Sequence, residues 1–272
     1  MARGLALAAP ALIWTAAFFV VPVAAILWLS LFQDGEGPGL ATFQRMMATG
    51  FVWTALWNSV WLTAVVTVCA LLLAYPLAAA IAFRVPERWQ RLVLMLIVLP
   101  FWTSYVVRSY AWLLVLAPNG VVNAAFMGLG LIEAPLKLSF TTAATVMGFV
   151  HFFTMLATLT IYASLVQINP RLMMAARDLG AGSLQVFVRV VLPLSMPGVA
   201  AAVFLIVVVT MGDYITPQIL GGNNDLVLPQ TIMMQILRRN DQEMAAVLSV
   251  LLMVVVAIAY LALARRMRAV PT

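Results

Sequence analysis

Long apolar runs without a charged residue constrain this chain more than any other feature of its sequence. Five of them exceed the roughly 18 apolar residues that a helix needs to cross a hydrocarbon core: residues 4–33, 46–83, 138–170, 190–212 and 244–264. A sixth run, 92–107, continues past Arg108 as far as residue 117. With 65% apolar and 9% charged residues, too little polar surface remains to cover a soluble globule. The sequence therefore predicts an integral membrane protein.

The lengths of these runs predict helices. Strands of a transmembrane barrel are about 10 residues long and alternate apolar with polar residues, a pattern that this sequence lacks. We therefore expect an all-α integral membrane protein with six transmembrane helices, at 7–31, 58–83, 92–117, 138–165, 194–216 and 244–264. The first run is about twice as long as the apolar core of a signal peptide, so we interpret it as a span. The loops leave no room for a soluble domain, so residues 1–272 are expected to form one transmembrane domain.

Charged residues mark alternate ends of the predicted spans. Ten of the 15 lysines and arginines lie on one side: Arg3, Arg84, Arg88, Arg91, Arg171, Arg177, Arg189, Arg265, Arg266 and Arg268. Six of the nine acidic residues lie on the other side: Asp34, Glu36, Glu133, Asp225, Asp241 and Glu243. Because cytoplasmic loops carry an excess of lysine and arginine, both termini are expected in the cytoplasm. The net charge of +6 thus reflects topology, and no nucleic-acid partner is expected.

The segment between the fourth and fifth spans, at about 169–183, has the signals of a short cytoplasmic helix. Asn169 is suited to cap its N-terminus, with Pro170 at the first helical position. Gly180 and Gly182 supply a stop. Apolar residues recur at helical spacing between these ends: Leu172, Ala175, Ala176 and Leu179. By itself the pattern fits either a helix lying on lipid headgroups or a rigid knob for a protein partner.

The same segment resembles the EAA signature of ABC importer permeases, in which Glu-Ala-Ala, three residues, Gly and nine residues precede Ile-x-Leu-Pro. This chain has the same spacing, with Met174, Ala175, Ala176, Gly180, Val190, Leu192 and Pro193. The resemblance implies a coupling helix seated in a cleft of an ATP-binding subunit. It implies these docking residues: Arg171, Met174, Ala175, Ala176, Arg177, Asp178, Leu179 and Gly180. Met174 replaces the usual glutamate, so docking is expected to depend on apolar packing and on the three charged residues of this set.

Two further segments resemble those of spermidine/putrescine-type permeases. Residues 99–112 (LPFWTSYVVRSYAW) are similar to the third-span motif of that group, and residues 212–222 (GDYITPQILGG) to its fifth-span exit. The resemblance implies import of a polyamine or a related small amino compound across the bacterial inner membrane. It also implies three partners: a second homologous permease subunit, a homodimer of an ATP-binding subunit that holds ATP and Mg, and a periplasmic solute-binding protein.

The outer segment at about 221–241 has two interpretations. Residues 229–237 have the apolar spacing of a helix, approached by the polar residues Asn223, Asn224 and Asp225. The resemblance implies that this region contacts the solute-binding protein. The alternative is a helix that lies on the membrane surface.

Two charged residues, Arg108 and Asp213, fall inside predicted spans, near the outer face. Such charges are costly and usually face a cavity or a partner. Either the two form a structural pair, or Asp213 meets a cationic solute in an outer vestibule. Ring faces attract ammonium groups, so Trp102, Tyr105, Tyr110 and Tyr214 complete the candidate pathway. Arg108 opposes a cationic solute unless it is neutralised.

The sequence contains no phosphate-binding glycine loop, metal cluster or nucleophile arrangement. The chain itself is therefore expected to bind no cofactor or metal and to be a transport subunit, not an enzyme. The alternatives are a permease of this family for another small solute, or a secondary transporter or channel not driven by ATP. A secondary transporter is expected to carry a midplane carboxylate or a pair of discontinuous helices, and Asp213 lies too near the outer edge.

Overall fold

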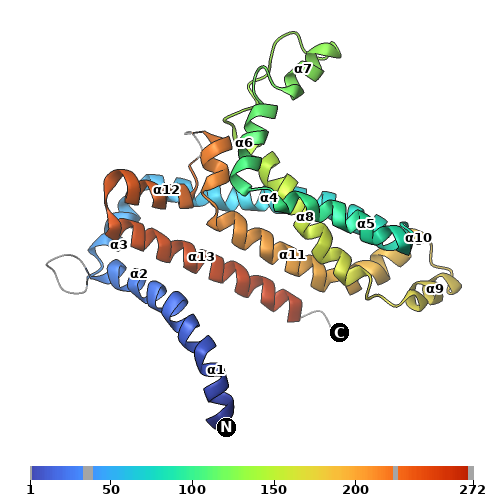
Figure 1. The fold of residues 1–272 in the computed structure, drawn as a ribbon, viewed down its shortest axis with the longest axis horizontal. Helices are drawn as coiled ribbons and strands as arrows, with labels where there is room; N and C mark the ends of the chain where they lie inside the picture. Colours follow the sequence, from blue (N-terminus) through green and yellow to red (C-terminus); the bar gives the residue numbers. More distant parts are fainter. Residues whose placement is uncertain (1, 33–38, 223–225, 269–272) are drawn as a thin grey trace. The chain divides into compact units, whose positions relative to one another are not determined.

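The structure, a computed structural model, describes the backbone of residues 2–32, 39–222 and 226–268, and the side chains of residues 9–32, 39–222 and 226–265. Every regular element among these residues is helical (Figure 1), as the sequence predicted. The α-helices are α1 (Ala2–Thr15), α2 (Val21–Leu31), α3 (Ala41–Ala48), α4 (Gly50–Phe83), α5 (Glu87–Val98), α6 (Tyr105–Val115), α7 (Val121–Gly128), α8 (Thr142–Leu165), α9 (Pro170–Asp178), α10 (Ser183–Val186), α11 (Leu192–Gly212), α12 (Leu228–Met234) and α13 (Gln242–Arg268). Shorter segments join some of them: the 3-10 helix η2 (Leu99–Trp102) and the π-helices η1 (Ala16–Val20), η3 (Phe187–Val191), η4 (Pro217–Gly221) and η5 (Gln235–Arg239).

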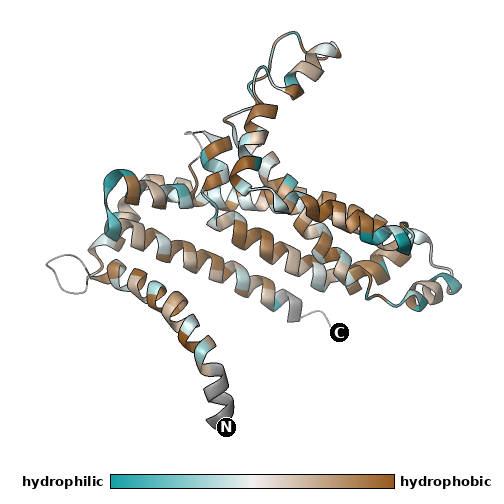
Figure 2. Cartoon of the chain, viewed as in Figure 1, coloured by the Kyte–Doolittle hydropathy of each residue, from teal (hydrophilic) through white to brown (hydrophobic). Residues whose placement is uncertain are grey.

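Five helical stretches in the described part of the chain are long and apolar enough to cross a membrane: Ala9–Leu31, Gly50–Phe83, Thr142–Leu165, Ser183–Gly212 and Gln242–Arg265. Brown, hydrophobic turns dominate them in Figure 2. They correspond to five of the six predicted spans. Two of them begin earlier than predicted, because residues 51–57 continue α4 and because α10 and η3 run into α11. The predicted fourth span instead starts later, since the Thr141 side chain caps α8 by accepting the Ala144 N–H.

The predicted third span, 92–117, is not one straight helix. The stretch Glu87–Trp102 meets Tyr105–Val115 at an angle of 92°. Pro100 lies in η2, and Thr103 and Ser104 are extended before α6 begins. Proline lacks an N–H and interrupts the helical hydrogen bonds, and the Thr103 hydroxyl donates to the Pro100 carbonyl at 2.7 Å instead. The bent pair makes a sixth span only if its two arms cross the membrane together.

The described residues group into two compact units. The first comprises Met1–Trp57 and Val227–Val255, and the second Asn58–Leu226 and Val256–Thr272. The first unit has a core of buried apolar side chains: Met46, Val52, Leu228, Met244, Val247 and Leu248. The predicted outer helix is present as α12 and η5, buried at Leu228 and exposed at Leu237. Its polar approach, Asn223, Asn224 and Asp225, lies outside the described residues.

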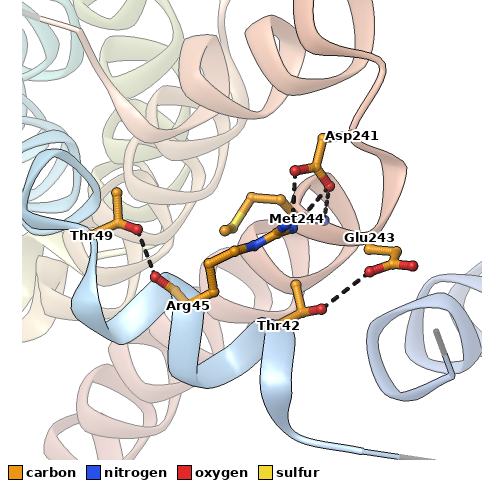
Figure 3. Close-up of polar contacts among 6 residues, drawn as sticks. All are labelled: Thr42, Arg45, Thr49, Asp241, Glu243 and Met244. Carbon is orange, nitrogen blue, oxygen red and sulfur yellow. Dashed lines mark hydrogen bonds and ion pairs between the residues drawn. The ribbon is translucent and has the colours of Figure 1, made fainter. Parts of the chain in front are cut away.

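A polar clamp ties α3 to the N-terminus of α13 in this unit (Figure 3). Arg45 donates to both carboxylate oxygens of Asp241, at 3.1 and 2.9 Å. Asp241 also accepts the N–H of Met244 at 2.9 Å, and Thr42 donates to Glu243 at 3.2 Å. A carboxylate at a helix N-terminus satisfies free N–H groups and is favoured by the helix dipole. Asp241 therefore caps α13 while it holds α3 in place.

Close contact between α8 and α11 organises the second unit. A Cβ atom added to Gly198 would lie 2.5 Å from the Ser164 Cβ and 3.1 Å from the Thr160 carbonyl oxygen. Small residues allow helix backbones to approach in this way in membranes. The Ser195 hydroxyl lies 2.7 Å from that of Tyr75 on α4. In the chain, α9 follows the end of α8 and precedes α10 and η3, which lead into α11.

Candidate functional site

Helix α9 follows the C-terminal end of α8 and begins where the sequence predicted. Pro170 occupies its first position, and the Asn169 side chain accepts the N–H of Arg171 at 3.0 Å. Such a cap satisfies one of the N–H groups that a helix leaves free at its start. The N-terminus of α9 is thus fixed by residues of its own segment. Figure 1 shows α9 at one end of its unit, beyond the long helices.

The C-terminus of α9 is closed by Gly180. This residue has a φ of +86°, a conformation that costs most other residues about 1–2 kcal/mol. The Gly180 N–H donates to the Arg177 carbonyl at 2.8 Å, and the Ala181 N–H to the Ala176 carbonyl at 3.0 Å. This pair of bonds is a Schellman motif, which satisfies the last carbonyls of a helix. Both ends of α9 are therefore closed by local hydrogen bonds.

Between these ends α9 buries no side chain. All eight predicted docking residues lie on α9 or directly after it, and seven of them are exposed, while Ala176 is half-buried. Leu179 is 89% exposed, Met174 53% and Leu172 47%. In Figure 2 the helix mixes pale and teal turns, unlike the brown long helices. The second unit thus presents a short, well-formed helix with apolar side chains directed into open space.

One continuous helical stretch connects the end of this loop to the predicted pathway. Gln185 caps it at the start by accepting the N–H of Gly182 at 3.2 Å. The stretch Ser183–Gly212 then runs through α10, η3 and α11 for 30 residues, or about 45 Å at 1.5 Å per residue. Asp213 directly follows its last residue. The exposed helix α9 precedes one end of this stretch, and the half-buried carboxylate of Asp213 follows the other end.

Asp213 is held by two kinds of contact. Its Oδ1 accepts the N–H groups of Ile215 at 2.7 Å and Thr216 at 3.4 Å, capping the helical segment that continues into η4. Its Oδ2 accepts a hydrogen bond from the Tyr105 hydroxyl, which also contacts the Thr216 hydroxyl. Tyr105 is the first residue of α6. The carboxylate therefore joins the end of α11 to the corner between α5 and α6.

Arg108 has different partners, and the predicted pair with Asp213 is not formed within the described residues. One guanidinium nitrogen donates to the carbonyls of Pro100 at 3.0 Å and Thr103 at 3.2 Å, across the bend. The guanidinium carbon lies 5.0 Å from the ring centroid of Phe152, a cation–π distance. Its Nε and Nη1 are buried without a hydrogen-bond partner among the described residues. Arg108 thus stabilises the corner of the bent pair.

The structure assembles only part of the predicted pathway. Tyr105, Asp213 and Arg108 gather around the bend, whereas Trp102 and Tyr110 are exposed, and Tyr214 is half-buried beside Asp213. Sequence reasoning missed Phe152, whose ring centroid lies 6.0 Å from that of Tyr105 and which also contacts Arg108. A phenylalanine within an uncharged run carries no signal that distinguishes it from its neighbours. Thr216 was missed as an individual residue, although it lies in the fifth-span motif.

Comparisons with known proteins cover the part of the chain that contains both α9 and the residues around Asp213. Residues 74–269 match the family described as "Binding-protein-dependent transport system inner membrane component". The "Spermidine/putrescine transport system permease protein PotB" of Salmonella typhimurium (strain SL1344) is 33% identical over 191 residues, 70% of this chain and 66% of that protein. The match therefore spans just under two thirds of that relative's length. The protein of the same name from Haemophilus influenzae is 32% identical over 203 residues, 75% of this chain and 71% of that one.

A solved structure has a similar fold over almost the whole chain. It is that of a bacterial alginate ABC transporter in complex with its alginate pentasaccharide-bound periplasmic protein. One of its chains superposes with a TM-score of 0.82, covering 98% of this chain and 95% of that one, at 19% identity. At this level of identity the likeness concerns the fold alone.

Proposed function

Because this chain belongs to the family of binding-protein-dependent transport system inner membrane components, we propose that it forms half of the translocation pathway of an ATP-driven importer. The other half is a second, homologous permease subunit. A homodimer of an ATP-binding subunit docks on the cytoplasmic side, and a periplasmic protein delivers the solute. In this arrangement the five long helices and the bent pair are six spans of one permease domain in the inner membrane, with both termini in the cytoplasm.

The exposure of α9 carries this proposal. A nine-residue helix that buries no side chain gains little stability from packing, yet both of its ends are closed by hydrogen bonds. A helix that lies on lipid presents one continuous apolar face. The exposed positions of α9 instead mix Met174 and Leu179 with Arg171, Arg177 and Asp178, which suits the groove of a protein. We assign the ATP-binding subunit as the occupant of this surface.

The continuity from Ser183 to Gly212 supports a coupling route. Movement of α9 with its partner displaces α10, which it contacts, and with it the whole of α11. The far end of α11 holds Asp213, whose bond to Tyr105 links it to α6. Rearrangement of this contact switches the pathway between inward-open and outward-open states, which are the two states of alternating access.

Purification of the chain from native membranes tests the proposal. The solubilised chain is expected to co-purify with a second permease and an ATPase, and the reconstituted complex to import solute only with ATP. The result that contradicts the proposal is uptake by the chain alone in proteoliposomes under an ion gradient. That outcome identifies a secondary transporter.

The names of the two relatives and the half-buried contact of Asp213 with Tyr105 support a polyamine, or a related cationic amine, as the solute. A carboxylate attracts ammonium groups, and Tyr105 adds a ring face beside it. Two charges of opposite sign in a partly buried site attract far more strongly than in water. We therefore place Asp213 and Tyr105 on the solute pathway.

The variant Asp213→Asn tests this role. Asparagine keeps an acceptor oxygen for the Ile215 N–H but removes the charge, so uptake of radiolabelled spermidine is expected to fall at least about tenfold, equivalent to about 1.4 kcal/mol. Association with the ATPase remains. Glu133→Gln, which removes an exposed carboxylate, serves as the control and leaves uptake unchanged. Equal uptake by Asp213→Asn and wild type means that the carboxylate is a helix cap only.

A further inference from the structure

A groove lies beside α9, and residues of the C-terminal part of α4, of α9, of α10 and of η3 line it. Its volume is about 650 Å³. Most of its lining residues are apolar, among them Ala79 and Phe83 on α4 and Phe187 and Val191 on η3. The rings of Phe187 and Tyr75, which both line the groove, pack edge-on with 5.6 Å between their centroids. Such a lining suits a hydrocarbon chain.

Two arginines lie among the lining residues. Arg84 directly follows the last residue of α4, and Arg177 is in the last turn of α9. Neither guanidinium has a hydrogen bond or ion pair to another residue in the described ranges, and no acidic residue lines the groove. Two cations thus face one apolar groove without a counter-charge. An anion bound in the groove supplies the missing counter-charge.

From this combination we propose that the groove binds an anionic phospholipid of the inner leaflet. The phosphate binds Arg84 and Arg177, and an acyl chain packs against the apolar lining at Ala79. Arginine donors match phosphate oxygens well, and basic pockets between helices on the cytoplasmic side bind anionic headgroups. A lipid seated there contacts both α4 and α9, so it braces the docking helix against the membrane. This inference depends on the proposed function for the cytoplasmic position of α9.

The test uses the purified complex in nanodiscs with increasing fractions of phosphatidylglycerol in phosphatidylcholine. Native mass spectrometry counts the retained lipids. Arg84→Gln is expected to weaken retention of phosphatidylglycerol about fivefold, the factor for one arginine near a membrane surface. Arg88→Gln removes the charge of another exposed arginine, one that does not line the groove, and it is expected to bind lipid as wild type does. Arg177 is left intact because it also belongs to the docking surface.

A second variant separates the lipid from other anions. Ala79→Phe fills part of the groove but keeps both arginines, so it is expected to lose the phospholipid. Inorganic phosphate is expected not to displace the lipid from wild type. The inference is overturned if Arg84→Gln or Ala79→Phe retains phosphatidylglycerol normally, or if wild type shows no preference for it over phosphatidylcholine. Crosslinking of position 84 to an acidic segment of a partner protein also overturns it. Lipid retention is measured whether or not an ATPase accompanies the chain, so its failure is distinguishable from failure of docking.

Discussion

Replacement of Leu179 by aspartate is expected to release the ATPase from the purified complex. Leu179 is 89% exposed, so the substitution removes little packing within this chain, and its effect falls on the partner. Loss of a central apolar anchor from a protein interface costs at least about 2 kcal/mol, or about thirtyfold in affinity. The carboxylate introduced at position 179 adds a desolvation cost when the partner covers it. Co-purification of the ATPase and ATP-dependent uptake are both expected to disappear.

Leu237→Asp provides the matched control. Leu237 is 72% exposed on η5 in the other unit, so the chemical change is the same at a site remote from α9 in the sequence. This variant is expected to retain the ATPase. If both variants retain it, or if both lose it, Leu179 does not contribute specifically to docking.

Replacement of Gly180 by valine is expected to uncouple ATP hydrolysis from uptake. A β-branched residue at a φ of +86° is strained by about 1–2 kcal/mol, which favours a different end for α9. The two hydrogen bonds of the Schellman motif are then lost, and Leu179 and Asp178 move. The expected result is uptake reduced about tenfold, in line with that strain, while membrane insertion and basal ATP hydrolysis by the complex persist.

Two other variants isolate the backbone effect. Gly182 has a φ of −69°, and no heavy atom lies within 4 Å of a Cβ placed on it or on Gly180. Gly182→Val is therefore expected to behave as wild type does, and Gly180→Asn to keep most of the uptake because asparagine tolerates left-handed conformations. Equal losses in Gly180→Val and Gly182→Val indicate steric exclusion by the partner, and they argue against backbone strain as the cause.

The position and length of α9 follow from the sequence because both of its ends depend on local residues. Asn169 acts two residues away and Gly180 closes a motif that reaches back only to Ala176. No tertiary contact is needed for either. The same reasoning holds for the long apolar helices, whose existence depends on composition.

The bend of the third predicted span was only partly predictable. Pro100 signals an interruption, but the angle of 92° depends on the extended backbone at Thr103 and Ser104. It also depends on Arg108, which binds carbonyls on both sides of the corner. An arginine in an apolar run predicts a polar environment, and here the backbone exposed by the proline supplies it.

The partners of Asp213 were beyond prediction from a single sequence. Tyr105 lies 108 residues away in the chain, and the two residues meet only because α6 packs against η4. The motifs marked both segments as important but carried no information about which side chains touch. Neither motif includes Phe152, because its role depends on where its ring lies relative to Arg108 and Tyr105 in the folded chain.

The unbroken stretch from Ser183 to Gly212 has a mechanical consequence. A rod of about 45 Å that pivots at one end displaces its other end by about 0.8 Å for every degree of tilt. A tilt of about 3° at the end near α9 thus moves the end near Asp213 by more than about 2 Å, enough to take a hydrogen bond beyond its range. Because the stretch is long, a small rotation at the end near α9 produces a large displacement at the other end, and this suffices to separate Tyr105 from Asp213.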